Sequence, residues 1–77
     1  MGADTDALEP ALLRIGEAAG VVWSYLHKKG KVPLTKLIDD VDLSRDLLMQ
    51  AIGWLARENK LQFSETSRRK MVALRPE

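Results

Sequence analysis

The 77-residue sequence predicts an α+β fold in which helices come first and a β-hairpin closes the chain. Up to about Asn59, apolar residues recur every three or four positions, which is the period of a helix that buries one face. After Asn59 the apolar period shortens to two, the period of a strand. A short polar stretch at residues 39–44 interrupts the helical pattern and indicates a tight turn between two helices. We therefore expect three helices followed by a hairpin.

The first helix is predicted to begin near Pro10, with Asp6 or Glu9 as its N-cap. We expect residues 1–9 to form a flexible acidic lead, because they hold few large apolar side chains, and residues 10–77 to form one domain. The predicted apolar face of this helix consists of Leu12, Ile15, Ala19, Val22 and Leu26. Gly30 can adopt the left-handed conformation that ends a helix.

A brief extended piece at residues 31–33 is predicted to lead into a second helix at residues 34–40. Ser44 is a good N-cap for a third helix, which continues to about Asn59. The apolar face of that helix consists of Leu48, Ala51, Ile52 and Leu55. The hairpin follows, with alternating Leu61 and Phe63, then Val72 and Leu74, on either side of a polar connection at residues 65–69. This order is that of a winged helix-turn-helix domain, in which the hairpin is the wing.

Two segments carry a narrower resemblance. Residues 15–23 (IGEAAGVVW) and 51–60 (AIGWLARENK) resemble a family of short, stand-alone bacterial winged-helix proteins, the domain of unknown function 2582. The broader likeness to winged-helix proteins covers about residues 11–75. The resemblance implies a winged helix-turn-helix fold and an inferred ability to bind DNA.

Composition excludes several classes of site. The sequence has no cysteine, which rules out disulfides, thiolate metal sites and cysteine nucleophiles. His27 is the only histidine, and Asp39, Asp40 and Asp42 lack the glycine and terminal glutamate of a calcium loop. No serine has a nucleophile's setting and no glycine-rich phosphate loop exists. We therefore expect no enzyme activity, small-molecule substrate, cofactor or metal.

The chain also lacks an apolar run long enough to span a membrane, and its first residues lack a signal-peptide pattern. We expect a cytoplasmic protein without membrane contact. The net charge is +1, but charge is unevenly distributed along the chain. The acidic side chains Asp4, Asp6 and Glu9 precede residue 10, so the rest of the chain is more basic. The mildly basic remainder permits DNA binding without requiring it.

The first functional hypothesis is a transcription-associated regulator that binds double-stranded DNA. The third helix would enter the major groove with the face opposite its apolar stripe. The candidate reading residues on that face are Arg45, Met49, Gln50 and Arg57. On the wing, Arg68, Arg69 and Lys70 would contact a minor groove or the phosphate backbone. The competing interpretation is that these are ordinary surface charges, which on a hairpin prevent edge-to-edge aggregation.

The second hypothesis is a protein-interaction or homodimerisation module that does not bind DNA. Trp54 lies at helical spacing from Leu47, and the two would form an apolar flank beside the core face. Gly16 and Gly20 each cost a helix about 1 kcal/mol relative to alanine, so close packing should justify them. Together with Trp23 they would form a groove for the third helix of the same chain, which is our default expectation, or for a second copy.

Overall fold

The computed structural model describes residues 2–76, and the side chains of residues 10–76. Within these residues the chain forms three helices and one antiparallel sheet with strand order β1-β3-β2. In chain order the elements are α1 (Gly2–Lys29), β1 (Val32–Pro33), α2 (Leu34–Asp40), α3 (Arg45–Arg57), β2 (Leu61–Thr66) and β3 (Arg69–Leu74). The predicted α+β winged helix, three helices with a C-terminal hairpin wing, is confirmed.

Helix α1 begins at Gly2 and carries Pro10 inside it. The predicted start near Pro10 is therefore wrong, and Asp6 and Glu9 do not cap the helix but lie within it. Proline has no backbone N–H, so one hydrogen bond of the helical ladder is lost at Pro10 while the backbone continues on either side. The division into a flexible lead and a domain beginning at residue 10 stays a prediction.

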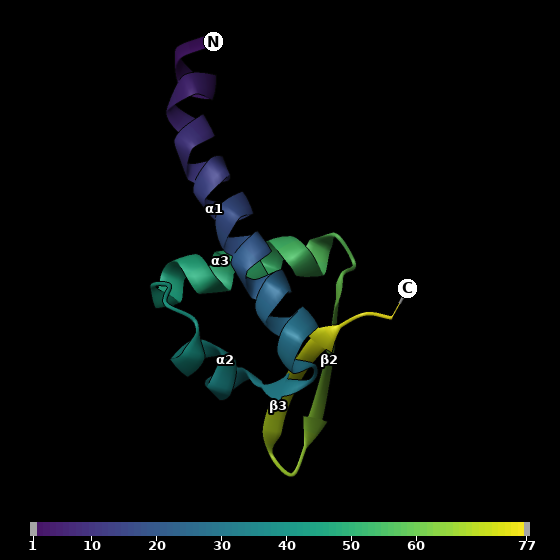
Figure 1. The fold of residues 1–77 in the computed structure, drawn as a ribbon. Coiled ribbons are helices and arrows are strands. Elements are labelled where there is room, and N and C mark those ends of the chain that lie inside the picture. Colours follow the sequence, from purple (N-terminus) through teal and green to yellow (C-terminus); the bar gives the residue numbers. More distant parts are fainter. Residues whose placement is uncertain (1, 77) are drawn as a thin grey trace.

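The first half of α1 projects beyond the rest of the molecule (Figure 1). On the predicted apolar face, Ala19, Val22 and Leu26 are buried, whereas Leu12 is 51% exposed. The prediction that Leu12 belongs to the core is wrong, because α3 covers only the later turns of α1. The core consists of Ala18, Ala19, Val22, Leu26, Val32, Leu37, Val41, Leu48, Ala51, Ile52, Leu55, Leu61 and Val72.

Helices α2 and α3 are joined by residues 41–44, a turn short enough for a helix-turn-helix unit. Val41 is buried and anchors the turn to the core. Ser44 caps α3 as predicted, since its Oγ accepts a hydrogen bond of 3.2 Å from the Leu47 N–H. The predicted apolar face of α3 is buried in full.

Helix α3 ends in a Schellman motif. The N–H of Asn59 donates to the Ala56 carbonyl and the N–H of Lys60 to the Leu55 carbonyl, both at 3.0 Å. Asn59 itself has a φ of 61°, the left-handed conformation that reverses the chain. The helix is therefore slightly shorter than predicted, and Asn59 directs the chain into β2.

In the sheet, β3 is central and pairs with both neighbours: Val32 lies opposite Val72, and Leu61 opposite Leu74. Leu61 and Val72 are buried at the base of the hairpin. Phe63 on β2 also lies opposite Val72 on β3, and its side chain is 53% exposed. Phe63 is level with a buried residue, but it lies on the edge strand β2, whereas Val72 lies on the central strand β3, and the Phe63 side chain stays outside the core. The far end of the hairpin extends past the helices (Figure 1).

Candidate nucleic-acid interface

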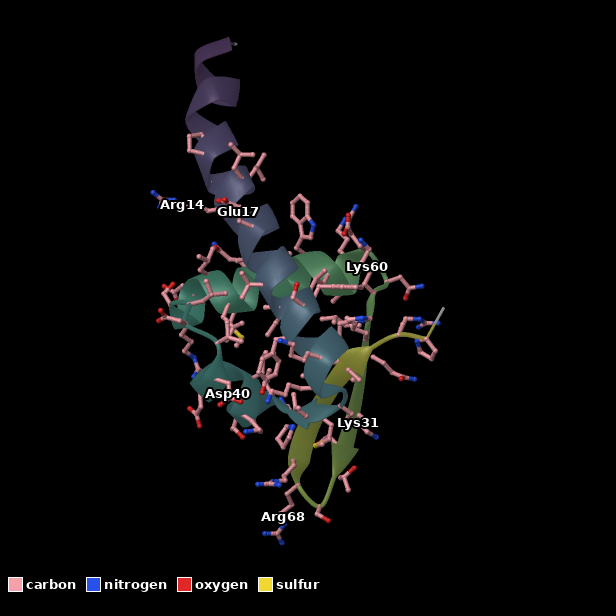
Figure 2. All side chains as sticks on the ribbon, in the orientation of Figure 1. Arg14, Glu17, Lys31, Asp40, Lys60 and Arg68 are labelled. Atoms are coloured by element: carbon pink, nitrogen blue, oxygen red, sulfur yellow. The ribbon has the colours of Figure 1, made fainter. Side chains whose placement is uncertain are left out.

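The wing ends in a two-residue turn formed by Ser67 and Arg68. Both residues have positive φ, 50° and 71°, as the type I′ turn of a tight hairpin requires. The strands therefore continue further than predicted, to Thr66 and Arg69, which lie opposite each other. Figure 2 shows Arg68 at the far end of the wing.

The wing-tip cluster consists of Arg68, Arg69 and Lys70, all exposed. Among the described side chains, the ion pairs are Lys36 with Asp40 at 3.1 Å and Lys60 with Glu58 at 3.4 Å. Neither pair includes a member of the wing-tip cluster. No carboxylate among the described side chains lies within ion-pair distance of these three cations, although Glu65 is the cross-strand neighbour of Lys70. The cluster can therefore bind an anionic partner.

A hollow of about 320 Å³ connects the wing-tip cluster with the start of α2. Its other lining residues are Pro33, Leu34 and Thr35. The sequence did not indicate Thr35, because only the pairing of β1 with β3 brings this distant segment beside the wing. The result is a concave, basic surface with a hydroxyl group at its edge.

On α3, Arg45, Gln50 and Arg57 are exposed, as a reading face requires. Met49 is half-buried against the core, so it has less free surface for a base edge than the sequence suggested. Neither arginine takes part in an ion pair among the described side chains. The hollow at the wing tip is lined by α2 and β1 residues rather than by α3, so the two predicted contact groups form separate surfaces.

The helix-turn-helix unit is tied to α1 through a polar contact between α1 and α2. The Tyr25 hydroxyl donates to Asp40 Oδ2 at 2.6 Å, and Lys36 Nζ lies 3.1 Å from the same oxygen. Burial, and then the adjacent carboxylate, raise the pKa of Tyr25 to about 12. The hydrogen bonds from Tyr25 and then Lys36 lower the pKa of Asp40. This contact was not anticipated from the sequence.

The predicted protein-interface residues come together only in part. Gly16, Gly20, Trp23 and Trp54 line one hollow of about 360 Å³ between α1 and α3. A neighbouring hollow of about 500 Å³ holds Gly16 and Trp54 again, with Leu12, Leu13 and Glu17. Leu47 lies outside both linings and packs, half-buried, against the core.

Packing among the described residues does not explain Gly16 and Gly20 of α1. A Cβ atom added at Gly16 or Gly20 would meet no atom within 4 Å. Our default expectation that the third helix packs closely on them is therefore wrong. The buried residues of α1 that face the core are the neighbouring Ala18, Ala19 and Val22.

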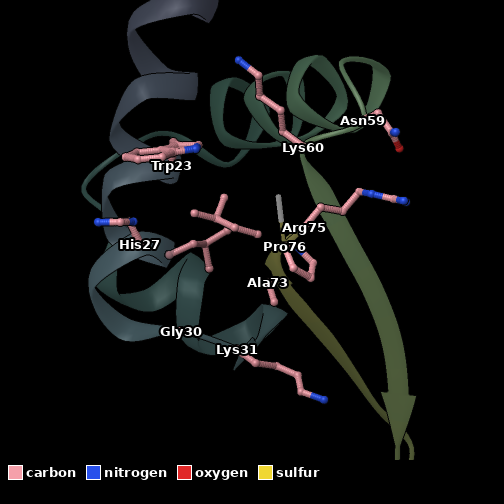
Figure 3. A pocket seen from close by; sticks show the side chains of 11 residues that line it. Trp23, His27, Gly30, Lys31, Asn59, Lys60, Ala73, Arg75 and Pro76 are labelled. Atoms are coloured by element: carbon pink, nitrogen blue, oxygen red, sulfur yellow. The ribbon is translucent and has the colours of Figure 1, made fainter.

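A fourth hollow, of about 1120 Å³, lies between the end of α1 and the base of the hairpin (Figure 3). The rings of Trp23 and His27 stack there with centroids 4.8 Å apart. Lys31, Lys60 and Arg75 also line this hollow, so Lys31 contributes to a basic surface at the base of the hairpin. In the described part of the chain, no group of three or more His, Cys, Asp or Glu residues is placed to hold a metal ion. No helix in that part combines the length and apolar character needed to cross a membrane.

Comparison with known proteins agrees with this architecture. A family model described as a winged helix-turn-helix domain (DUF2582) matches residues 9–74. The match spans the second part of α1, the helix-turn-helix unit and both strands of the wing. No curated protein sequence matches the chain. Because the family model covers most of the sequence, the chain belongs to the DUF2582 family of winged helix-turn-helix domains.

Proposed function

We propose that this protein binds double-stranded DNA as a transcription-associated regulator in the bacterial cytoplasm and catalyses no reaction. The observation that carries the proposal is the wing-tip cluster, in which Arg68, Arg69 and Lys70 are exposed at the end of a projecting hairpin and make no ion pair with any side chain that the structure describes. A winged helix-turn-helix fold is compatible with DNA binding but does not by itself establish it.

The chemistry of the wing tip suits the phosphate backbone. A cation that neutralises a phosphate releases a condensed counterion, which gives favourable and salt-dependent binding. The hollow between the wing-tip cluster and Thr35 can receive a phosphate group, since arginine and hydroxyl groups both donate to phosphate oxygens. Such contacts position the protein on the duplex without reading its sequence.

Helix α3 supplies the contacts that could read bases. Gln50 can pair with adenine, and Arg45 with guanine or a phosphate. Arg57 lies near the end of α3, where it can reach the backbone. Asp46 in the first turn of α3 opposes phosphate binding. We therefore expect the wing to provide most of the affinity and α3 to provide a modest sequence preference.

The test is fluorescence anisotropy with a labelled random-sequence duplex at low and moderate salt. Each phosphate contact contributes about −0.9 to the slope of log affinity against log salt. The double substitution Arg68→Ala, Arg69→Ala should weaken binding at low salt and reduce the slope by about two. No binding at low salt, or unchanged binding by the double variant, would contradict the proposal.

The matched control is Lys31→Ala with Arg75→Ala, which removes the same charge at the base of the hairpin, away from the wing tip. If binding depends only on net charge, the two double variants will lose the same affinity. If the wing tip is the contact, only the variant that lacks Arg68 and Arg69 will lose it. Comparing them separates a specific interface from general electrostatic attraction.

A further inference from the structure

Helix α1 presents an apolar surface that no other residue of the described part of the chain covers. Leu12 is 51% exposed, Leu13 62% and Trp54, which adjoins them from α3, 39%. Gly16 and Gly20 leave open space in the same surface. The exposed Leu12 thus lies about one helical turn from the open space at Gly16 and about two turns from the open space at Gly20. We call the set Leu12, Leu13, Gly16, Gly20 and Trp54 the α1 surface.

The molecule is elongated. Its radius of gyration is 13.7 Å, against about 11.5 Å for a compact domain of this length. The first half of α1, which projects beyond the rest of the molecule, produces this shape and leaves a length of helix along which a second helix can pack (Figure 1).

The spacing of residues on α1 makes the surface complementary to itself. Leu12, Gly16 and Gly20 are four residues apart and form one ridge of the helix. When two copies of α1 run antiparallel around a two-fold axis at Gly16, Leu12 of each copy lies over Gly20 of the partner subunit. A two-fold interface requires this reciprocity. The large side chain therefore fills the space that the missing Cβ leaves.

Charge also favours the antiparallel direction. The first turns of α1 carry Asp4, Asp6 and Glu9 in the sequence, and its last turn carries His27, Lys28 and Lys29. An antiparallel pair brings the acidic end of one helix to the basic end of the other, whereas a parallel pair brings like charges together. The first half of α1 projects beyond the folded body of the chain (Figure 1). In the antiparallel arrangement this projecting half would run beside the folded body of the other copy, so the two bodies would lie apart.

We propose that the protein is a homodimer in which α1 pairs antiparallel with α1 of a second copy, across Gly16. Leu12 of each chain fills the space above Gly20 of the partner subunit, and the two Trp54 side chains flank the crossing. This arrangement gives the two glycines the close helix approach that the single chain does not provide. It does not depend on whether the protein binds DNA.

Sedimentation equilibrium over a wide concentration range tests the oligomeric state. The wild-type chain should show twice the monomer mass of 8.6 kDa and dissociate on dilution. Gly20→Leu should raise the dissociation constant at least about thirtyfold, the effect of losing an energetic anchor. The monomer tolerates this leucine, because the space at Gly20 is open and leucine has the higher helix propensity. Circular dichroism verifies that the variant is folded.

The matched control is Gly53→Leu, the same change at an equally open position on α3 outside the α1 surface. It should leave the dissociation constant unchanged. A wild-type chain that stays monomeric at the highest concentration would overturn the proposal. So would a dimer that Gly20→Leu and Gly53→Leu weaken equally, because the α1 surface would then not be the contact.

Cross-linking tests the geometry. The chain has no cysteine, so any disulfide that forms must involve the single introduced thiol. In the proposed dimer the two Gly16 positions meet at the axis, and Gly16→Cys should form an intermolecular disulfide on mild oxidation. Val21→Cys, at a position 47% exposed on another face of α1, should not form one. Equal cross-linking of the two variants, or none for Gly16→Cys, would overturn the antiparallel crossing.

Discussion

Chain reversals in this small domain are made by residues in the left-handed conformation. Gly30 ends α1 with a φ of 78°, and Asn59 ends α3 with a φ of 61°. Ser67 and Arg68 form the wing turn with the same sign of φ. Glycine adopts this region freely, whereas side chains with a Cβ are strained there and asparagine is the most tolerant of them. Three of these four positions therefore hold strain that substitution can relieve or increase.

At Asn59 we expect β-branched residues to be destabilising. Asn59→Val should lower the free energy of unfolding by about 1 to 2 kcal/mol, because valine is disfavoured at positive φ. Asn59→Gly should match or slightly exceed the stability of the wild type. Urea unfolding measures both variants. Similar values for valine and glycine would show that the left-handed conformation at Asn59 is not maintained in solution.

The Tyr25–Asp40 contact should make stability depend on pH at both extremes. The pKa of Tyr25 is raised from 10.0 to about 12. Its contribution to the free energy of unfolding is therefore complete below pH 10 and is lost as the pH rises toward 12. The pKa of Asp40 is lowered from 3.8, so its contribution is present above that pH and is lost as the pH falls through the lowered value.

Tyr25→Phe should therefore reduce the urea midpoint most between these limits, and the difference from wild type should shrink in acid and in strong base. Asp39→Asn is the control, because Asp39 adjoins Asp40 but makes no ion pair among the described side chains. A constant difference between Tyr25→Phe and wild type across the pH range would contradict the expected coupling.

At the scale of elements, the wing combines an unfavourable turn sequence with a proposed binding role. A two-residue hairpin turn with positive φ at both positions favours Asn-Gly, whereas this chain has Ser67 and Arg68. The usual signal for such a turn is thus absent from the sequence. Arg68 occupies a strained position at the tip of the wing, where its φ is 71°.

Replacing the turn should separate stability from binding. Ser67→Asn with Arg68→Gly should raise the free energy of unfolding by about 1 kcal/mol, since both residues then suit their backbone conformation. The same variant should bind duplex DNA more weakly, with a salt slope reduced by about one, because one cation is lost. Ser67→Asn alone should be more stable with unchanged binding. Equal binding by both variants would remove Arg68 from the proposed interface.

For the whole molecule, we predict that the core does not depend on residues 1–9. Among the side chains that the structure describes, from residue 10 onward, the first core residue is Ala18. At a concentration where the chain is monomeric, removing residues 1–9 should change the unfolding temperature little. It should weaken the proposed dimer, because the acidic end of α1 is lost. A large fall in unfolding temperature would show that residues 1–9 stabilise the monomer.

Local patterns in the sequence determined most of the architecture. The helical period located α2 and α3, the change to a period of two located the wing, and Ser44 and Gly30 marked helix ends. These features depend on interactions between residues a few positions apart, which sequence spacing records directly. The same patterns identified Arg68, Arg69 and Lys70 as the densest basic cluster of the chain.

Only the tertiary structure decided which apolar residues are covered and which distant residues meet. Leu12 and Phe63 have the periodicity of core residues, yet both side chains are more than half exposed, Leu12 on α1 ahead of the first core residue and Phe63 on the edge strand β2. Gly16 and Gly20 suggested packing inside the chain, but the space above them is open. Thr35 reaches the wing tip, and Tyr25 reaches Asp40, through contacts between separate elements. Periodicity states which face of an element is apolar, whereas burial depends on where the other elements end, and that is a property of the folded chain.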